Sequence, residues 1–268
     1  MMTMVSSVFS LLLGLGILLI GSGCLGTLLG MRATVEHFPE MVTGLIMSSY
    51  FLGFVAGAYF CPPMINRVGH IRTFAAMAAV ASAVVLIHAL VVDPLAWAVL
   101  RFVTGVCSVG LFMVIESWLN SQSSNQRRGQ VFAVYMTVNM VAMAAGQYLI
   151  LINDIRTYVP FAVITILYSL SLVPVALTRV LEPAPVAAPA LRLHYLFGKS
   201  PLGVLGTLIA GLVSGAFWGM GAVFAKLMGL PNHWIAGFMS AVIMGGAVLQ
   251  LPIGRLSDHR DRRVVLLA

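Results

Sequence analysis

The sequence Gly254-Arg255-Leu256-Ser257-Asp258-His259-Arg260-Asp261-Arg262-Arg263 is a dense charged segment in an otherwise apolar chain. A second short basic segment, Pro62 to Arg72, begins 192 positions earlier and again lies between two long apolar runs. With this shift and no gap, residues 11–53 align with residues 203–245 at ten identical positions, including glycines, serines and a proline. A chance match between apolar runs is the alternative, but the shared register with the charged segments favours a parallel internal duplication.

The composition is typical of a membrane protein. The chain is 60% hydrophobic and 9% charged, with a mean hydropathy of +1.01, whereas about a quarter of the residues of a soluble domain are charged. The net charge of +7 is spread over short segments, so we expect no nucleic-acid partner. The three cysteines form no CxxC pair, and we therefore expect no metal site, no disulfide framework and no cofactor.

Eight apolar runs are long enough to cross a membrane. About 20 apolar residues span a hydrocarbon core of about 30 Å, and such runs satisfy their backbone polar groups as helices. The runs are Val8 to Leu29, Val42 to Ile65, Thr73 to Val92, Leu95 to Ile115, Val131 to Ile152, Val159 to Thr178, Leu202 to Ala225 and Trp234 to Ile253. The sequence therefore predicts an all-α polytopic bundle surrounded by membrane lipid.

The loops differ in basic residues. The even-numbered loops hold eleven of the fifteen Lys and Arg residues, and three lie in or beside the odd-numbered loops. By the positive-inside rule, the N-terminus and the even loops are cytoplasmic. The longest loop, residues 179–201, opens with three prolines and predicts a cytoplasmic linker, whose segment Leu191 to Phe197 could form a short interfacial helix. The linker separates a six-helix unit, residues 1–178, from residues 202–268.

The charged segment resembles a motif of the major facilitator superfamily of transporters. Gly254, Leu256, Asp258, Arg262 and Arg263 match its cytoplasmic signature G-x-L-x-D-x-x-x-R-R, which occurs between helices 2 and 3 and again between helices 8 and 9. The first copy is degraded, with Pro62, Asn66 and His70 at the glycine, aspartate and arginine positions, but Arg67 and Arg72 keep the segment basic and Gly69 suits a tight turn.

Further matches point to one branch of this superfamily. Arg101 and Gly105 resemble its R-x-x-x-G motif in helix 4. Together with Asn125-Gln126-Arg127-Arg128-Gly129 and the segment from Leu251 to Leu256, they make the chain most similar to the YcaD-type branch.

The resemblance implies a fold and a function. The expected fold is a complete six-helix N-terminal bundle followed by the first two helices of a C-terminal bundle, so the chain looks truncated after helix 8. The expected function is secondary transport of a small solute by alternating access in a cytoplasmic membrane of bacterial type, with a proton as the candidate coupling ion and uniport as the alternative. A non-transporting fragment, or a sensor or scaffold built on a transporter frame, is the alternative.

An enzyme is not expected. The spans contain no HExxH motif, no acidic pair and no Ser/His/Asp set on which catalysis could be built.

Arg101 is the strongest candidate for a solute-binding or coupling residue. An arginine inside a span costs about 2.5–3.5 kcal/mol on insertion scales, so it normally has a role. It could face a central cavity, or its side chain could reach the outer headgroups. Glu116 lies fifteen residues further along, about 22 Å away on a helix. It could form an ion-pair latch with Arg67 or Arg72, or be an exposed terminal carboxylate.

Other polar and aromatic residues in spans are weaker candidates. Asn139 and Gln147 are eight positions apart, hence roughly on one helix face, and could line a cavity or form interhelical hydrogen bonds. Gln250 has the same two readings. Trp218 could stack on a solute, as could Phe217 and Tyr50, although aromatic residues in spans more often serve packing.

The two basic loops are candidates for gating. Asn66, Arg67, Gly69 and Arg72 in the first loop, Gly254, Asp258, Arg262 and Arg263 in the second, and Glu116 beside them form this set. Asp258 and Arg262 are spaced i, i+4 and would pair on a helix for only a few tenths of a kcal/mol. The alternative is that these loops are solvated turns that set orientation.

Overall fold

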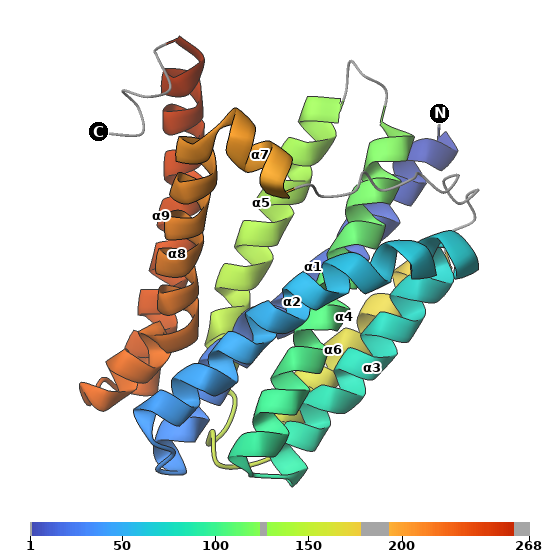
Figure 1. The fold of residues 1–268 in the computed structure, drawn as a ribbon. Coiled ribbons are helices and arrows are strands. Elements are labelled where there is room, and N and C mark those ends of the chain that lie inside the picture. The colour runs from blue at the N-terminus through green and yellow to red at the C-terminus, as the bar shows by residue number, and fades with distance from the viewer. Residues whose placement is uncertain (1, 124–127, 178–192, 260–268) are drawn as a thin grey trace.

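The computed structural model describes residues 2–123, 128–177 and 193–259, and the side chains of 2–8, 193, 251 and 253–259 are not described. Within these ranges all regular structure is helical (Figure 1). The elements are α1 (Met2–Val35), α2 (Glu40–Val68), α3 (His70–Leu90), α4 (Pro94–Gln122), α5 (Arg128–Gly146), the 3-10 helix η1 (Gln147–Leu151), α6 (Val159–Ala176), α7 (Leu193–Lys199), α8 (Pro201–Leu227) and α9 (Asn232–His259).

The predicted all-α membrane bundle is confirmed. Eight helical segments are long and apolar enough to cross a membrane, and they coincide with the eight apolar runs of the sequence. Most of these helices extend several residues beyond the apolar runs, into the more polar residues at either end. The short helix expected near Leu191 to Phe197 is present as α7.

Local sequence signals place several helix ends. The Asp93 side chain accepts a hydrogen bond from the Ala96 backbone N–H at 2.8 Å, and Pro94 follows as the first residue of α4, an arrangement typical of helix starts. Gly69 alone separates α2 from α3, with φ of 89°. Because residues other than glycine rarely adopt this backbone conformation, Gly69 permits the abrupt turn in the first basic loop.

Helices α1–α6, here called the six-helix unit, pack closely on one another. α1 lies against α5 and α6, α2 against α4, and α3 against α4 and α6. The α8–α9 pair contacts α1, α2, α5 and η1. The buried residues of α8 lie in its last third, from Gly219 to Ala225, and those of α9 lie between Ile235 and Ile243. Among the side chains that the structure describes, the α8–α9 pair therefore packs on the six-helix unit near the turn that joins α8 to α9 (Figure 1).

The helix bounds reproduce the internal repeat. Adding 192 to Val35, the last residue of α1, gives Leu227, the last residue of α8. The same shift carries Glu40, the first residue of α2, onto Asn232, the first residue of α9. The α1–α2 and α8–α9 hairpins thus turn at equivalent positions, which favours duplication over a chance match of apolar runs.

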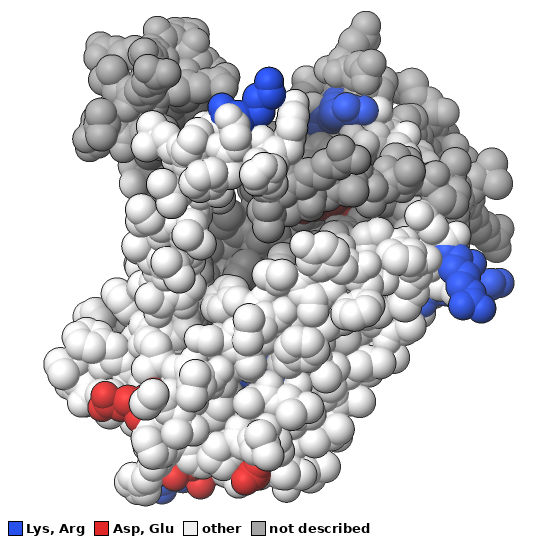
Figure 2. All heavy atoms as spheres, viewed as in Figure 1, with Lys and Arg blue, Asp and Glu red and all other residues white. Residues whose placement is uncertain are grey.

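Charges separate between the two ends of the bundle (Figure 2). Exposed basic side chains at the α7 end include Arg67, Arg72, Arg128 and Lys199. The opposite end carries exposed carboxylates together with Arg32, Arg156 and Lys226, of which Arg32 forms an ion pair with Glu36 at 2.6 Å. Among the described residues, the α7 end is therefore the more positive of the two.

The closest helix crossing joins α2 to α4. A Cβ added at Gly105 would collide with the Tyr50 carbonyl oxygen and lie 2.8 Å from the Phe54 nitrogen, and one added at Gly53 would collide with the Phe102 carbonyl oxygen. Small residues at such crossings let helix backbones approach closely. The glycine of the R-x-x-x-G motif therefore allows α4 to lie against α2 at Tyr50.

Replacing this glycine should loosen the bundle. We expect Gly105→Ala to destabilise the protein by about 1–3 kcal/mol, because the added methyl overpacks a backbone contact, and thus to lower its Tm in detergent by several degrees. Gly26→Ala is the matched control, since nothing lies within 4 Å of a Cβ there, and alanine in a helix should leave Tm unchanged or raise it. An equal Tm for the two variants would show that the crossing tolerates a side chain.

Candidate functional site

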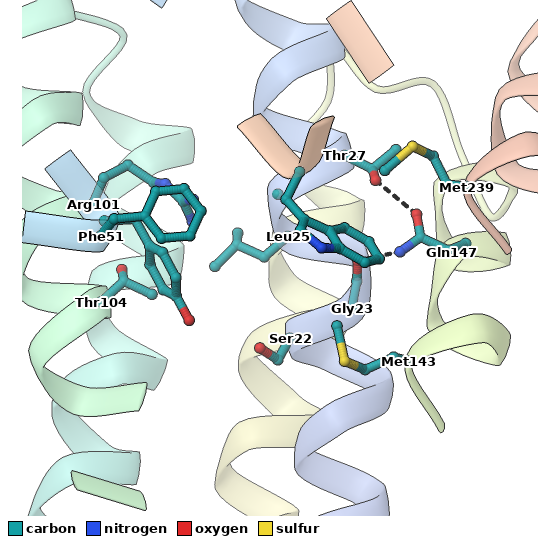
Figure 3. Close-up of a pocket in the computed structure, with 13 residues that line it drawn as sticks. Ser22, Gly23, Leu25, Thr27, Phe51, Arg101, Thr104, Met143, Gln147 and Met239 are labelled. Atoms are coloured by element: carbon teal, nitrogen blue, oxygen red, sulfur yellow. Dashed lines mark hydrogen bonds between the residues drawn. The ribbon is translucent and has the colours of Figure 1, made fainter. Parts of the chain in front are cut away.

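A cavity of about 210 Å³ lies where the six-helix unit meets the α8–α9 pair. Six α-helices form its walls, and the 3-10 helix η1 adds the polar side chain of Gln147 (Figure 3). The lining residues are Ser22, Gly23, Leu25, Gly26 and Thr27 of α1, Tyr50 and Phe51 of α2, Arg101 and Thr104 of α4, Met143 of α5, Gln147 of η1, Trp218 of α8 and Met239 of α9.

Arg101 is the cationic group of this cavity. It lies seven residues into α4, about 10 Å along the helix axis, and only 7% of it is exposed. Its guanidinium carbon lies 4.6 Å from the centroid of the Tyr50 ring, within range of a cation–π interaction. The side chain therefore turns into the bundle rather than reaching along the helix toward the outer headgroups.

The Arg101 guanidinium lacks a counter-ion. It forms no ion pair with any described residue, and its buried Nε has no hydrogen-bond partner. No aspartate or glutamate lines the cavity. A buried charge with so few partners is costly in a low-dielectric interior.

Gln147 lines the opposite wall and is held by α1. The Thr27 hydroxyl donates to Gln147 Oε1 at 2.6 Å, and Gln147 Nε2 donates to the Gly23 carbonyl at 2.6 Å. Gln147 is 1% exposed. Both readings of this residue therefore apply, because it lines the cavity and also forms interhelical hydrogen bonds.

The α8–α9 pair contributes two residues, Trp218 and Met239. Trp218 packs edge-on against Phe217, with ring centroids 5.4 Å apart. The repeat relates Trp218 to Gly26 of α1, and both line the cavity. Nothing lies within 4 Å of a Cβ at Gly26, so the missing side chain leaves part of the cavity open.

Two predicted residues do not reach the cavity. Asn139 is eight positions before Gln147, which on an α-helix is about 12 Å along the axis and leaves the two side chains about 80° apart. Gln250 follows Met239 on the same face of α9, but eleven residues further along, about 16 Å. It is exposed and is absent from the cavity lining. Neither amide is therefore among the residues that line this cavity, and a solute-binding role for them stays a prediction.

Glu116 has a different partner from the expected one. Tyr135 Oη of α5 donates to Glu116 Oε1 at 2.8 Å, and Asn139 lies beside the same hydroxyl. Glu116 forms no ion pair with Arg67 or Arg72, although the structure describes all three residues. Glu116 and the two arginines are all exposed, so the alternative of an exposed carboxylate near the end of α4 describes Glu116 better than the ion-pair latch.

The gating loops are described in part. Asn66, Arg67 and Arg72 are exposed around the turn at Gly69. In the second loop the α9 backbone runs through Gly254 and ends at His259. The Asp258 side chain and both Arg262 and Arg263 lie outside the described residues, so the Asp258–Arg262 pair stays a prediction.

Sequence reasoning missed the hydroxyls of the site. Thr104 is three residues from Arg101 within the R-x-x-x-G motif, so the helical period would have placed it beside the arginine. Thr27 is one of few polar residues in the second half of α1, but its partner Gln147 is 120 residues away. Among the residues that the structure describes, no group of three His, Cys, Asp or Glu side chains could hold a metal ion.

Comparison with known proteins shows the family to which this chain belongs. Residues 11–268 match the model of the Major Facilitator Superfamily. The chain is 30% identical over 263 residues to an uncharacterized MFS-type transporter, YcaD, of Escherichia fergusonii, covering 97% of this chain and 68% of the relative. YcaD of Escherichia coli K12 is 29% identical over 270 residues, covering 99% and 70%.

A solved structure has the same fold. The nucleoside transporter NupG, in a mutant form, superposes with a TM-score of 0.75 over 93% of this chain and 68% of its own. At 13% identity this similarity concerns the fold alone. The confirmed fold, the family match and the YcaD relatives agree: the chain belongs to the major facilitator superfamily of membrane transporters and is an integral membrane protein similar to its YcaD-type branch.

Proposed function

We propose that this protein is a secondary transporter that moves a small solute by alternating access, and that the Arg101 cavity is its solute site. One observation carries the proposal: a cavity with a buried cationic group, Arg101, lies at the junction of the six-helix unit and the α8–α9 pair. In transporters built from repeats, the solute site lies between the repeats, and one bundle moves against the other around it.

The packing supports access from one side. Beyond the cavity, toward the α8–α9 turn, α1 lies against α8, with an added Gly30 Cβ only 3.0 Å from Val223. Toward α7, a groove of about 1330 Å³ opens between α2, α7 and α8, and Phe51 lines both this groove and the cavity. The solute would therefore enter or leave past Phe51 toward the α7 end.

The charge distribution supports an orientation. Because basic residues gather at the α7 end, the positive-inside rule places that end and the N-terminus in the cytoplasm of a bacterial cell. The described state would then be open to the inside. Residues 1–178 and 202–268 would be the parts that move, with residues 179–201 as the link between them.

A proton is the coupling ion we propose, and Glu116 is its carrier. Among the carboxylates whose side chains the structure describes, Glu116 is the one within a helix beyond its first residue; it is exposed and lies six residues before the end of α4. Its hydrogen bond from Tyr135 joins α4 to α5. An ionisable group inside a span is a functional candidate by default.

Locking the closed end should stop transport. In a variant with Cys24, Cys61 and Cys107 replaced by alanine, we expect an oxidised Gly30→Cys/Val223→Cys pair to reduce solute flux at least tenfold, and reduction to restore it. Flux is measured as solutes lost from proteoliposomes filled with a bacterial metabolite extract, identified by mass spectrometry.

A second pair controls for the crosslink itself. Ser82 of α3 and Ser169 of α6 have hydroxyl oxygens 3.0 Å apart within the six-helix unit, so Ser82→Cys/Ser169→Cys should crosslink without loss of flux. Equal flux through the oxidised and reduced Gly30/Val223 pair would refute alternating access about this contact.

Glu116→Gln should uncouple transport from the proton gradient while keeping solute exchange. The amide keeps an oxygen that can accept the Tyr135 hydrogen bond but cannot carry a proton. We expect uptake driven by an imposed pH gradient to fall at least tenfold and solute exchange at equal pH to change less than twofold. Gradient-driven uptake that survives the substitution would show that the proton binds elsewhere.

A further inference from the structure

The chemistry of the cavity wall limits the solute. Resting on the transport function proposed above, we infer that the cavity binds a small organic monoanion, a carboxylate attached to a flat apolar body. The carboxylate would bind Arg101, and the body would lie among Tyr50, Phe51 and Trp218.

The charge follows from Arg101. Its guanidinium is 7% exposed, has no ion pair among described residues, and leaves Nε without a hydrogen bond. The facing ring of Tyr50 offers only a weak counter-charge. A carboxylate would supply both the missing charge and acceptors for the planar fork of donors.

The cavity fits a solute with a single negative charge. The lining contains one cation and no carboxylate. A cationic solute would be repelled, and a dianion would bring a second charge that nothing in the wall neutralises. Because unpaired charges are costly once a bound solute has displaced water from the wall, the wall should discriminate against both.

The rest of the solute should be poor in hydrogen-bonding groups. Thr27 and Gln147 use their polar atoms on each other and on Gly23, and the Thr104 hydroxyl donates to the Leu100 carbonyl at 2.8 Å. Few donors and acceptors are therefore free for a sugar or polyol, which would leave its hydroxyls unpaired.

The shape of the solute follows from the apolar lining. Aromatic rings from α2 and α8, together with the side chains of Leu25, Met143 and Met239, surround the space beside the guanidinium. Flat rings and polarizable thioethers favour a flat apolar body. The cavity volume of about 210 Å³ is below the roughly 300–1,000 Å³ of pockets for drug-sized ligands, so the solute is small.

Matched acids and amides test the inference on the purified protein. Benzoate and phenylacetate are compared with benzamide and phenylacetamide, which have the same shape without the charge, and with the dianion phthalate. Binding is measured by titration calorimetry and by the rise in Tm. We expect at least one acid to bind at least tenfold more tightly than both its amide and phthalate.

Two cavity variants and one control locate the binding. Arg101→Gln should weaken binding of that acid at least tenfold and leave the amide unchanged. Gly26→Leu should weaken both acid and amide, because the side chain fills the open space at position 26. Arg156→Gln removes an exposed arginine of the loop between η1 and α6, outside the cavity, and should bind the acid as the wild type does.

The inference is overturned if neither acid binds better than its amide, or if the preference for the acid survives Arg101→Gln. These results are separate from those that test transport. Flux of a neutral solute that the Gly30/Val223 crosslink stops would keep the transport function and reject the anionic substrate. Arg101-dependent acid binding without any flux would keep the anionic ligand and reject the transport function.

Discussion

The buried guanidinium of Arg101 constrains the rest of the site. Its position depends on the α2–α4 crossing, where Gly53 and Gly105 let two backbones meet and so bring the Tyr50 ring to 4.6 Å from the charge. This contact offsets only part of the desolvation cost, since a cation–π interaction contributes about 2 kcal/mol even when it is desolvated. The R-x-x-x-G motif thus has a physical meaning here: its glycine allows the approach, and its arginine is left with an incomplete set of partners.

The internal repeat explains the asymmetry of the cavity. Equivalent positions in the two hairpins, Gly26 and Trp218, line the same space, but one has no side chain and the other has the largest. A bulky residue at both positions would fill the cavity, whereas glycine at both would leave the α8 side without an aromatic surface. Divergence of the two copies therefore creates room on the α1 side and an apolar wall on the α8 side.

The sequence predicted the elements of this fold better than the contacts of its site. Apolar runs and charged loops gave the eight spans, because lipid forces backbone groups into helices and places charges at the ends. Arg101 stood out because a charge in a span is rare. Asn139, Gln147 and Gln250 were grouped by polarity, but their helical phase and depth place only Gln147 in the cavity. The hydrogen-bond partner of Glu116 could not be predicted from the sequence, because nothing there distinguishes Tyr135 from other aromatic residues in the spans.

The distance between the proposed proton and solute sites indicates how they would be coupled. Over about 22 Å, two unit charges interact by less than about 1 kcal/mol at an effective dielectric of 20, too little to drive strong coupling through the field alone. Glu116 is, however, hydrogen-bonded to Tyr135 of α5, and α5 continues into η1, which carries Gln147 and contacts α9. Protonation of Glu116 would remove the charge that holds this hydrogen bond and weaken the α4–α5 contact. Because α5 and η1 both pack against α9, the change would reach the junction around the solute as a shift of helices. Coupling in this protein would then be conformational, with α5 as the element that both sites bias.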